Sequence, residues 1–338
     1  MFRTISTASL SRARTNASQK SISHTESAVE REERALAELK ELCRRNSVTW
    51  PKSELVREYA PDDNFEESNL LRYLRARKHD VHTAFKQYAA SAKWRHDIQL
   101  EKTYDDVGIT RFETVRRLQP QWTGHRDATG VPIMVYVVSQ VEADDILALH
   151  KTDPALSSIF LAAEYVTQFV QPLCGKLQHE RINTSINIID LSHVGVSPFW
   201  RLRKLLSTAS NMATAHYLET VKRIYVVGAP NFFPTIWRFI TICFEPATTR
   251  KIAVLGHGEC ATILRHDPGP ENVPKRFGGD LYWEFGGSPE LSPDAKSLSK
   301  KWVDKWVEGP LRIIDGPGEQ WRIIAVGSQN GELRREEL

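Results

Sequence analysis

Apolar residues in the second half of the chain form short runs that alternate with helical stretches. Runs rich in Val and Ile occupy residues 132–138, 186–191, 223–227 and 252–255. Helical periodicity separates them, at about residues 154–172, 198–214 and 232–244. Near-continuous apolar strands separated by helices are typical of a parallel sheet that is covered on its faces. We therefore predict an α/β fold with a mainly parallel sheet and right-handed crossover connections.

Helical patterns also precede the predicted sheet. Charged residues alternate from Glu26 to Arg45 around a narrow apolar stripe, and Asn64 to Asp97 has the spacing of a pair of helices. After Gly279 the chain becomes rich in Gly and Pro, with an amphipathic segment and two strand candidates, at residues 301–307, 311–314 and 321–326. We divide the chain into a tail (1–25), a helical linker (26–61), a helical lobe (62–97), an α/β domain (112–280) and an extension (281–338).

Composition and charge restrict the class of protein. Of the 338 residues, 41% are hydrophobic and 26% are charged, which is typical of a globular protein. The 45 basic and 42 acidic residues are too evenly balanced for a protein that coats nucleic acid. Residues 1–25 contain four basic side chains and no acidic one, which is typical both of mitochondrial presequences and of disordered tails.

No segment is long enough to span a membrane. The longest uncharged apolar stretch, Ile224 to Trp237, has 14 residues and two prolines, whereas a spanning helix needs about 20. We therefore expect a cytoplasmic protein with peripheral membrane contact, or a mitochondrial protein if residues 1–25 are a presequence.

The motifs of catalysis and metal binding are missing. The four cysteines form no CxxC pair, and the sequence has no HExxH, Walker A or GxSxG motif. Gly256 to Ala261 lies between a strand and a helix as a dinucleotide fingerprint does, but no further strand with an acidic residue follows it. A tight turn is the better interpretation. We predict no catalytic residue, no metal and no cofactor.

A basic run, Leu70 to Val81, has two interpretations. Its sequence, LLRYLRARKHDV, fits a solvated helix face, and it also fits a phosphate site built from guanidinium and ammonium groups. The run closely resembles the signature of the helical lobe of the CRAL-TRIO lipid-binding family, including the Trp94-Arg95 pair that follows it. Further segments resemble motifs of this family in the same order, at residues 130–133, 189–191, 216–219, 227–233, 245–252 and 274–279.

The resemblance is strongest to fungal-type phosphatidylinositol transfer proteins. It implies a helical lobe, a sheet that forms the floor of a large apolar pocket, and a mobile gate helix that closes the pocket. It also implies phosphatidylinositol as the bound phospholipid. The implied function is non-enzymatic transfer between phosphoinositide-containing membranes or presentation to a lipid kinase, without nucleic acid. The alternative is a lipid-regulated interaction or scaffold protein with the same fold.

Motif by motif, the resemblance assigns residues to three sites. The headgroup-binding residues are Arg77, Lys78, Glu219, Thr248 and Lys251. The lipid-pocket residues are Thr123, Met134, Ser185 and Asn187. The gate-helix residues are Phe232, Phe233, Ile236, Trp237 and Ile240, in a segment whose only charge is Arg238. Such a segment is either buried in the core or able to lie at a membrane interface.

At two positions linked to the second lipid of the family's exchange, this sequence departs from the family pattern. Thr123 and Met134 occupy positions where the family places two tyrosines that contact choline. Loss of the two rings removes cation–π partners for a quaternary ammonium. We therefore expect efficient phosphatidylinositol transfer and weak phosphatidylcholine transfer, with a sterol or another lipid as a possible counter-ligand.

Overall fold

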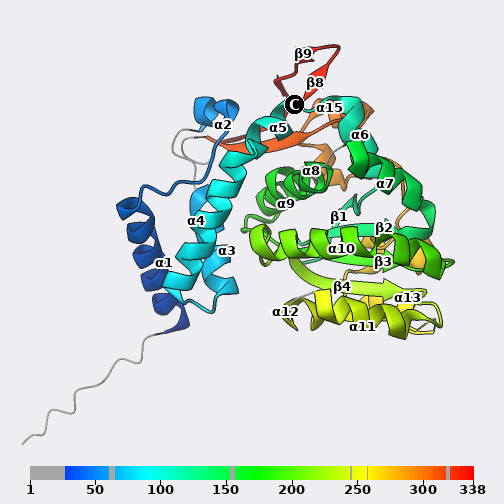
Figure 1. Ribbon diagram of the computed structural model, residues 1–338. Helices are drawn as coiled ribbons and strands as arrows, with labels where there is room; N and C mark the ends of the chain where they lie inside the picture. The colour runs from blue at the N-terminus through cyan, green and yellow to red at the C-terminus, as the bar shows by residue number, and fades with distance from the viewer. Residues whose placement is uncertain (1–26, 61–64, 153–156, 244–245, 257, 317–319) are drawn as a thin grey trace, which may run out of the picture.

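The computed structural model describes residues 27–60, 65–152, 157–243, 246–256, 258–316 and 320–338. The predicted tail, residues 1–25, lies outside the described residues. Figure 1 shows the arrangement of the elements, with the helical lobe on one side of the sheet and its covering helices. In the described residues, no helix combines the length and apolar character needed to cross a bilayer.

The main sheet has five strands in the order of the sequence. They are β1 (Gln121–Arg126), β2 (Pro132–Val137), β3 (Ser185–Asp190), β4 (Val221–Val227) and β5 (Ile252–Val254). The last three strand pairings are parallel, and β1 pairs antiparallel with β2. The predicted α/β fold with a mainly parallel sheet is confirmed, and the edge strand β1 is an addition that the sequence pattern did not indicate.

Helices cover both faces of this sheet. One face carries α8 (Ser157–Tyr165), a π-helical turn (Val166–Val170), α9 (Gln171–Gln178), α10 (Val196–His216) and α11 (Phe233–Cys243). The other face packs against α13 (Cys260–His266), two 3-10 turns (Pro270–Asn272 and Lys275–Phe277) and the segment that follows them. The predicted helix at 154–172 is thus interrupted by the π turn. Gly256 begins the turn that leads into α13, as predicted, because its carbonyl accepts hydrogen bonds from Glu259 and Cys260.

The helical lobe packs against the C-terminal end of α10. The chain before the sheet forms α1 (Ala28–Arg45), α2 (Glu54–Tyr59), α3 (Phe65–Ala76), α4 (Val81–Asp97), α5 (Leu100–Asp106) and α6 (Ile109–Arg117). The last carbonyls of a helix have no partner within the helix. In α10 these carbonyls accept hydrogen bonds from the lobe: Tyr73 Oη to His216, Gln87 Nε2 to Thr214 and Ala215, and Ser91 Oγ to Ala215.

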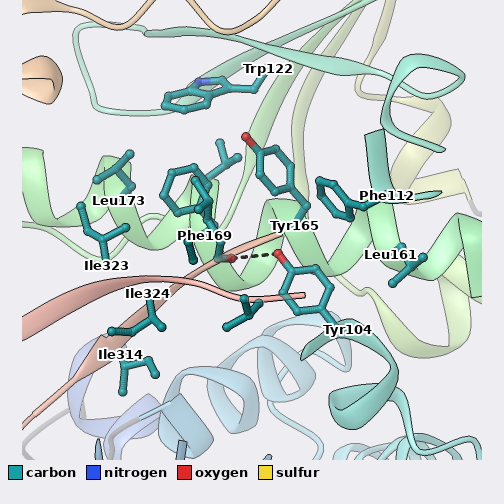
Figure 2. Close-up of a cluster of buried hydrophobic side chains, with 14 of the residues drawn as sticks. Tyr104, Phe112, Trp122, Leu161, Tyr165, Phe169, Leu173, Ile314, Ile323 and Ile324 are labelled. Carbon is teal, nitrogen blue, oxygen red and sulfur yellow. Dashed lines mark hydrogen bonds between the residues drawn. The ribbon is translucent and has the colours of Figure 1, made fainter. Parts of the chain in front are cut away.

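The C-terminal extension is part of the main core. It contains α14 (Pro293–Lys296), α15 (Lys300–Asp304) and a small sheet of β6 (Leu311–Asp315), β7 (Trp321–Ala325) and β10 (Glu336–Glu337), with a hairpin of β8 (Ser328–Gln329) and β9 (Glu332–Leu333). The helices α8 and α9 lie between the extension and the main sheet. Figure 2 shows Phe169 and Tyr165 in this layer, and Tyr104 Oη donates a hydrogen bond of 2.8 Å to the carbonyl of Leu311. The remaining elements are α7 (Ala143–Thr152), α12 (Pro246–Thr249) and a 3-10 turn (Val138–Gln140).

A buried charge network joins the lobe, the α/β domain and the extension. Arg95 of α4 donates hydrogen bonds of 2.9 and 2.6 Å to Glu164 of α8 and also pairs with Glu101 of α5. Arg312 of β6 donates to Glu101 at 2.9 Å and also pairs with Asp105. Burial alone would lower the pKa of Arg95, but the charges of Glu164 and Glu101 raise it well above its ordinary value. Both arginines are therefore charged and fully paired in the interior.

Candidate functional site

Three of the five residues assigned to the lipid headgroup lie at the amino ends of parallel strands. Glu219 comes just before β4, and Lys251 comes just before β5. Lys251 Nζ donates a hydrogen bond of 2.9 Å to Glu219 Oε2 and one of 2.7 Å to the carbonyl of Val221. The side chains of Glu219 and Lys251 are 36% and 27% exposed, so both charges are accessible from solvent. Two of the predicted headgroup residues thus form an ion pair with each other.

Thr248 belongs to the same turn as Lys251. Its carbonyl accepts a hydrogen bond of 2.9 Å from the amide of Lys251, and its side chain is half-buried. Glu219 has a left-handed backbone with φ of 51°, which is uncommon for a residue other than glycine and places it at a tight turn. The two turns that precede β4 and β5 thus position these three side chains at one edge of the sheet.

Arg77 and Lys78 follow the last turn of α3. Arg77 Nε donates a hydrogen bond of 2.6 Å to Gln87 Oε1, and Gln87 in turn binds the carbonyls at the end of α10. Lys78 is exposed and also has a left-handed backbone, with φ of 52°. Because α10 leads directly to Glu219, the lobe brings its basic residues toward the same edge of the sheet.

The sheet residues under α10 and α11 are only partly buried. Paired strands place Met134, Asn187, Ile224 and Ile252 in one row across this face. Asn187, Ile224 and Ile252 are half-buried, as is Ile189, whereas Ile186 and Ile188 on the opposite face are completely buried. The layer of α10 and α11 therefore leaves part of an apolar sheet face incompletely buried, although Val226 and Met134 on the same face are buried.

Of the predicted pocket residues, two pairs differ in their surroundings. Asn187 Nδ2 donates a hydrogen bond of 3.0 Å to Ser185 Oγ, which donates to the carbonyl of Thr220. Thr123 is completely buried, and its hydroxyl donates to the carbonyl of Ile133 within the sheet. Met134 is also buried, in the core cluster under α8 and α9. Asn187 thus lies at the partly accessible part of the floor and binds the buried Ser185, whereas Thr123 and Met134 lie at its packed end.

The predicted gate helix covers β4 and β5. Phe233 and Ile236 are buried against Val226, while Phe232 and Trp237 are half-buried beside them. The side chain of Ile240 and the whole of Phe244 lie outside the described residues. Ile242, near the end of α11, is 83% exposed. The helix thus has one face on the sheet and one apolar residue that points to solvent.

Two cavities among the described residues lie away from the predicted lipid site, and neither is lined by a predicted headgroup or pocket residue. One, of about 360 Å³, lies at the carboxyl ends of the parallel strands, where Arg276 donates a hydrogen bond of 2.9 Å to the buried Asp190. The other, of about 530 Å³, lies beside His125 and Tyr282. In the described part of the chain, no cluster of three or more His, Cys, Asp or Glu side chains could hold a metal ion.

Comparison with protein families identifies the class of protein. Residues 116–279 match the profile of the CRAL/TRIO domain, and residues 35–90 match that of the CRAL/TRIO N-terminal domain. These two regions of the chain therefore belong to the CRAL-TRIO family, as the sequence motifs predicted. The family relation accounts for the helical lobe, the mainly parallel sheet and their order in the chain.

The most informative relatives are fungal and plant proteins. The SEC14 cytosolic factor of Kluyveromyces lactis is 26% identical over 226 residues, which are 67% of this chain and 75% of the relative. That of Yarrowia lipolytica is 29% identical over 259 residues, 77% of this chain and 51% of the relative. The phosphatidylinositol/phosphatidylcholine transfer protein SFH7 of Arabidopsis thaliana is 28% identical over 211 residues, 62% of this chain and 38% of the relative.

A solved structure confirms the fold independently. The crystal structure of Sfh5 superimposes with a TM-score of 0.54 at 14% sequence identity. The match covers 82% of this chain and 98% of that structure. At this identity the comparison is informative about the fold alone.

Sequence reasoning did not find two groups of residues. One is the buried network of Glu101, Glu164 and Arg312, whose members are far apart in the chain. The other is the exposed part of α10, where Trp200 is 41% accessible although its sequence pattern resembles that of a core helix. The only sequence signal for the network was the Trp94-Arg95 pair, whose arginine is buried in it.

Proposed function

We propose that this protein binds phosphatidylinositol and exchanges it between membranes without chemical change. The observation that carries the proposal is the accessible apolar floor of the sheet under α10 and α11, which adjoins the charged edge at Glu219 and Lys251. An apolar floor suits acyl chains, and the charged edge suits a polar headgroup. The relatives named as phosphatidylinositol/phosphatidylcholine transfer proteins support this assignment.

The headgroup would be held by complementary charges and hydroxyl groups. Arg77 and Lys78 would neutralise the phosphate, since guanidinium and ammonium groups match phosphate oxygens. Glu219 would accept hydrogen bonds from inositol hydroxyls, and Thr248 would donate one. Lys251 already neutralises Glu219, so the carboxylate has a partner both with and without the lipid.

Energetics favour exchange over simple extraction. Moving about thirty methylenes from a bilayer into water would cost on the order of 24 kcal/mol, at ~0.8 kcal/mol for each methylene. The pocket must replace most of that burial when one lipid leaves. Loading a second lipid at the membrane as the first departs keeps the step near neutral, with α11 as the gate that opens.

A transfer assay with headgroup variants tests the proposal. Labelled phosphatidylinositol and phosphatidylcholine are followed between vesicles with the full chain, with Lys251→Ala and with Glu219→Ala. The matched control is the surface ion pair of Lys296 and Glu290, at 2.6 Å, which lies in the C-terminal part of the chain. We expect each headgroup variant to lose at least about tenfold in phosphatidylinositol transfer, equivalent to ~1.4 kcal/mol, while Lys296→Ala and Glu290→Ala transfer normally.

Other outcomes would reject the proposal or part of it. Normal phosphatidylinositol transfer by folded Lys251→Ala and Glu219→Ala would reject the headgroup site. Saturable lipid binding by the parent without any transfer would favour a lipid-regulated scaffold protein that could present the lipid to a kinase. Equal transfer of both phospholipids would reject the role given to Thr123 and Met134.

A further inference from the structure

The helix α10 is unusually exposed for an element that covers a sheet. Of its 21 residues, only Ser210 is buried. Val196, Trp200 and Arg203 follow one another at intervals of four and three residues, so they lie along one side of the helix. Val196 and Trp200 are 43% and 41% exposed, and the Arg203 guanidinium lies 5.9 Å from the centre of the Trp200 ring. An aromatic ring and basic groups thus share one accessible side.

The charged residues of α10, α11 and the chain between them are almost entirely basic. From Leu191 to Phe244 the sequence has one acidic residue, Glu219, which is paired with Lys251. On α10 itself, Arg201 pairs with Asp144 of α7, and Asp145 of α7 is exposed nearby. Within the part of the chain that the structure describes, Arg203, Lys204 and Arg238 form no ion pair, so α7 neutralises only one of the four basic groups on α10 and α11.

The two helices form a continuous outer layer. Figure 1 shows α10 across the sheet with α11 beyond it, and Phe199 of α10 contacts Phe239 of α11 with ring centres 5.5 Å apart. Arg238 of α11 is exposed, like Arg203 and Lys204 of α10. The exposed apolar residues of both helices, Trp200 and Ile242 among them, are therefore accompanied by unpaired basic groups.

We propose that α10 and α11 together form a docking surface for an anionic lipid bilayer, in which α10 supplies the charge selectivity. Tryptophan is enriched at the boundary between headgroups and acyl chains, and basic side chains bind anionic headgroups. Arg203 and Lys204 contact the anionic lipids, and Trp200 inserts at the boundary. The inference rests on the proposed function, because a lipid carrier must reach a bilayer, and it adds the composition of that bilayer.

Vesicle co-sedimentation of the full chain tests the docking surface. The vesicles contain phosphatidylcholine alone or phosphatidylcholine with phosphatidylserine. The charge variant is Arg203→Glu with Lys204→Glu, and the matched control is Lys300→Glu with Lys305→Glu at α15, where both lysines are exposed. Because each basic residue near an anionic surface contributes about a factor of five to binding, we expect the charge variant to bind phosphatidylserine vesicles at least about tenfold more weakly.

The remaining arms separate charge from insertion. The charge variant should bind pure phosphatidylcholine vesicles like the parent, and Trp200→Ala should bind both kinds of vesicle more weakly. Equal losses in the charge variant and the α15 control would overturn the proposal, since net charge alone would then explain binding. The proposal would also be overturned if the parent did not bind vesicles, or if Trp200 mediated self-association of the protein instead.

The result also separates this inference from the proposed function. If the parent binds phosphatidylserine vesicles through α10 but carries no phosphatidylinositol, the docking surface is supported and the proposed function is contradicted. If the variant with Arg203→Glu and Lys204→Glu transfers phosphatidylinositol as fast as the parent on vesicles that contain phosphatidylserine, the proposed function is supported and the docking surface is contradicted.

Discussion

The guanidinium of Arg312 lies between the carboxylates of Glu101 and Asp105, and only 1% of the residue is exposed. Removing one partner of a buried ion pair leaves an unpaired charge in the interior and costs about 3–5 kcal/mol. We expect Arg312→Ala to lower the free energy of unfolding by about that amount, as measured by urea denaturation at neutral pH.

The adjacent strand offers a matched control for this substitution. Arg322 of β7 pairs with Glu337 at 2.8 Å, but these side chains are 42% and 53% exposed. Exposed ion pairs contribute about 0–1 kcal/mol, so Arg322→Ala should change stability little. Similar losses in both variants would mean that the buried network is not what makes Arg312 important.

His216 gives a pH dependence that can be assigned to one residue. Its ring stacks on Trp94 with centres 3.9 Å apart, and burial together with the charge of Arg95 lowers its pKa to about 4. The unfolded chain takes up this proton near pH 6.5, so the folded state loses stability as pH falls from 6.5 toward 4. We expect His216→Gln to lose less stability than the parent between pH 7.5 and 5.

The urea midpoint is measured for the parent and for His216→Gln at pH 7.5 and at pH 5, and the shift between the two pH values is compared between the two proteins. Glu32 and Asp294, whose pKa values are about 2, stay charged in the folded state throughout this range, and their contribution to the slope is the same in parent and variant. Arg75 holds Glu32 in its charged form, and Arg126 does the same for Asp294 despite the opposing effect of burial. Identical shifts in parent and variant would exclude His216 as the source.

At the scale of elements, the strands that could be predicted are those whose burial is accompanied by a local run of apolar residues. The runs of Val and Ile marked β2 to β5 correctly, because parallel strands covered on both faces are apolar throughout. The strand β1 reads QWTGHR and contains Gly124, yet Gln121 to Gly124 are buried. Its burial comes from a segment far along the chain, since the amide of Glu290 donates to the carbonyl of Thr123, and no local pattern indicates that.

The proximity of Glu219 and Lys251 was predictable for a different reason. Motifs placed Glu219 and Lys251 in turns before two strands, and parallel strands bring such turns to one edge of the sheet. The network around Arg312 had no comparable signal, because its hydrogen-bond partners are 207 and 211 residues away. On their own helix, Glu101 and Asp105 have the spacing of a solvated face.

The gate helix can be tested at its exposed end. Because Ile242 is 83% exposed, a charged side chain at this position would not destabilise the folded state in water. The same charge would be costly at the boundary of a bilayer. We expect Ile242→Asp to keep the parent's thermal transition and to reduce phosphatidylinositol transfer at least about threefold, a loss of ~0.7 kcal/mol. Val303→Asp, at another exposed apolar residue, is the control. Unchanged transfer by Ile242→Asp would show that this end of α11 stays in water.

For the whole molecule, the extension behaves as core and not as an appendage. Leu311, Ile314, Ile323 and Ala325 share one apolar cluster with Tyr165 and Phe169 of the α/β domain (Figure 2). Removing residues 281–338 would expose that cluster and leave Glu101 and Asp105 without Arg312. We expect the shortened chain to lose its cooperative thermal transition and to aggregate, whereas a chain lacking residues 1–25 should melt like the parent. A shortened chain with the parent's melting temperature would contradict this.

The charge network also dictates when folding can finish. Glu101 and Asp105 leave the ribosome about two hundred residues before Arg312 does. While the entire CRAL/TRIO domain is being made, Asp105 therefore lacks its counter-ion in the network, and Glu101 has only Arg95. Contacts of such long sequence separation form slowly, because a large loop must close before they stabilise the chain. Until then the carboxylate of Asp105 has no buried cation to pair with, which favours its hydration and delays the final packing of α5. The last step of folding therefore waits for residue 312, and we expect nascent chains paused before it to be the form most dependent on chaperones.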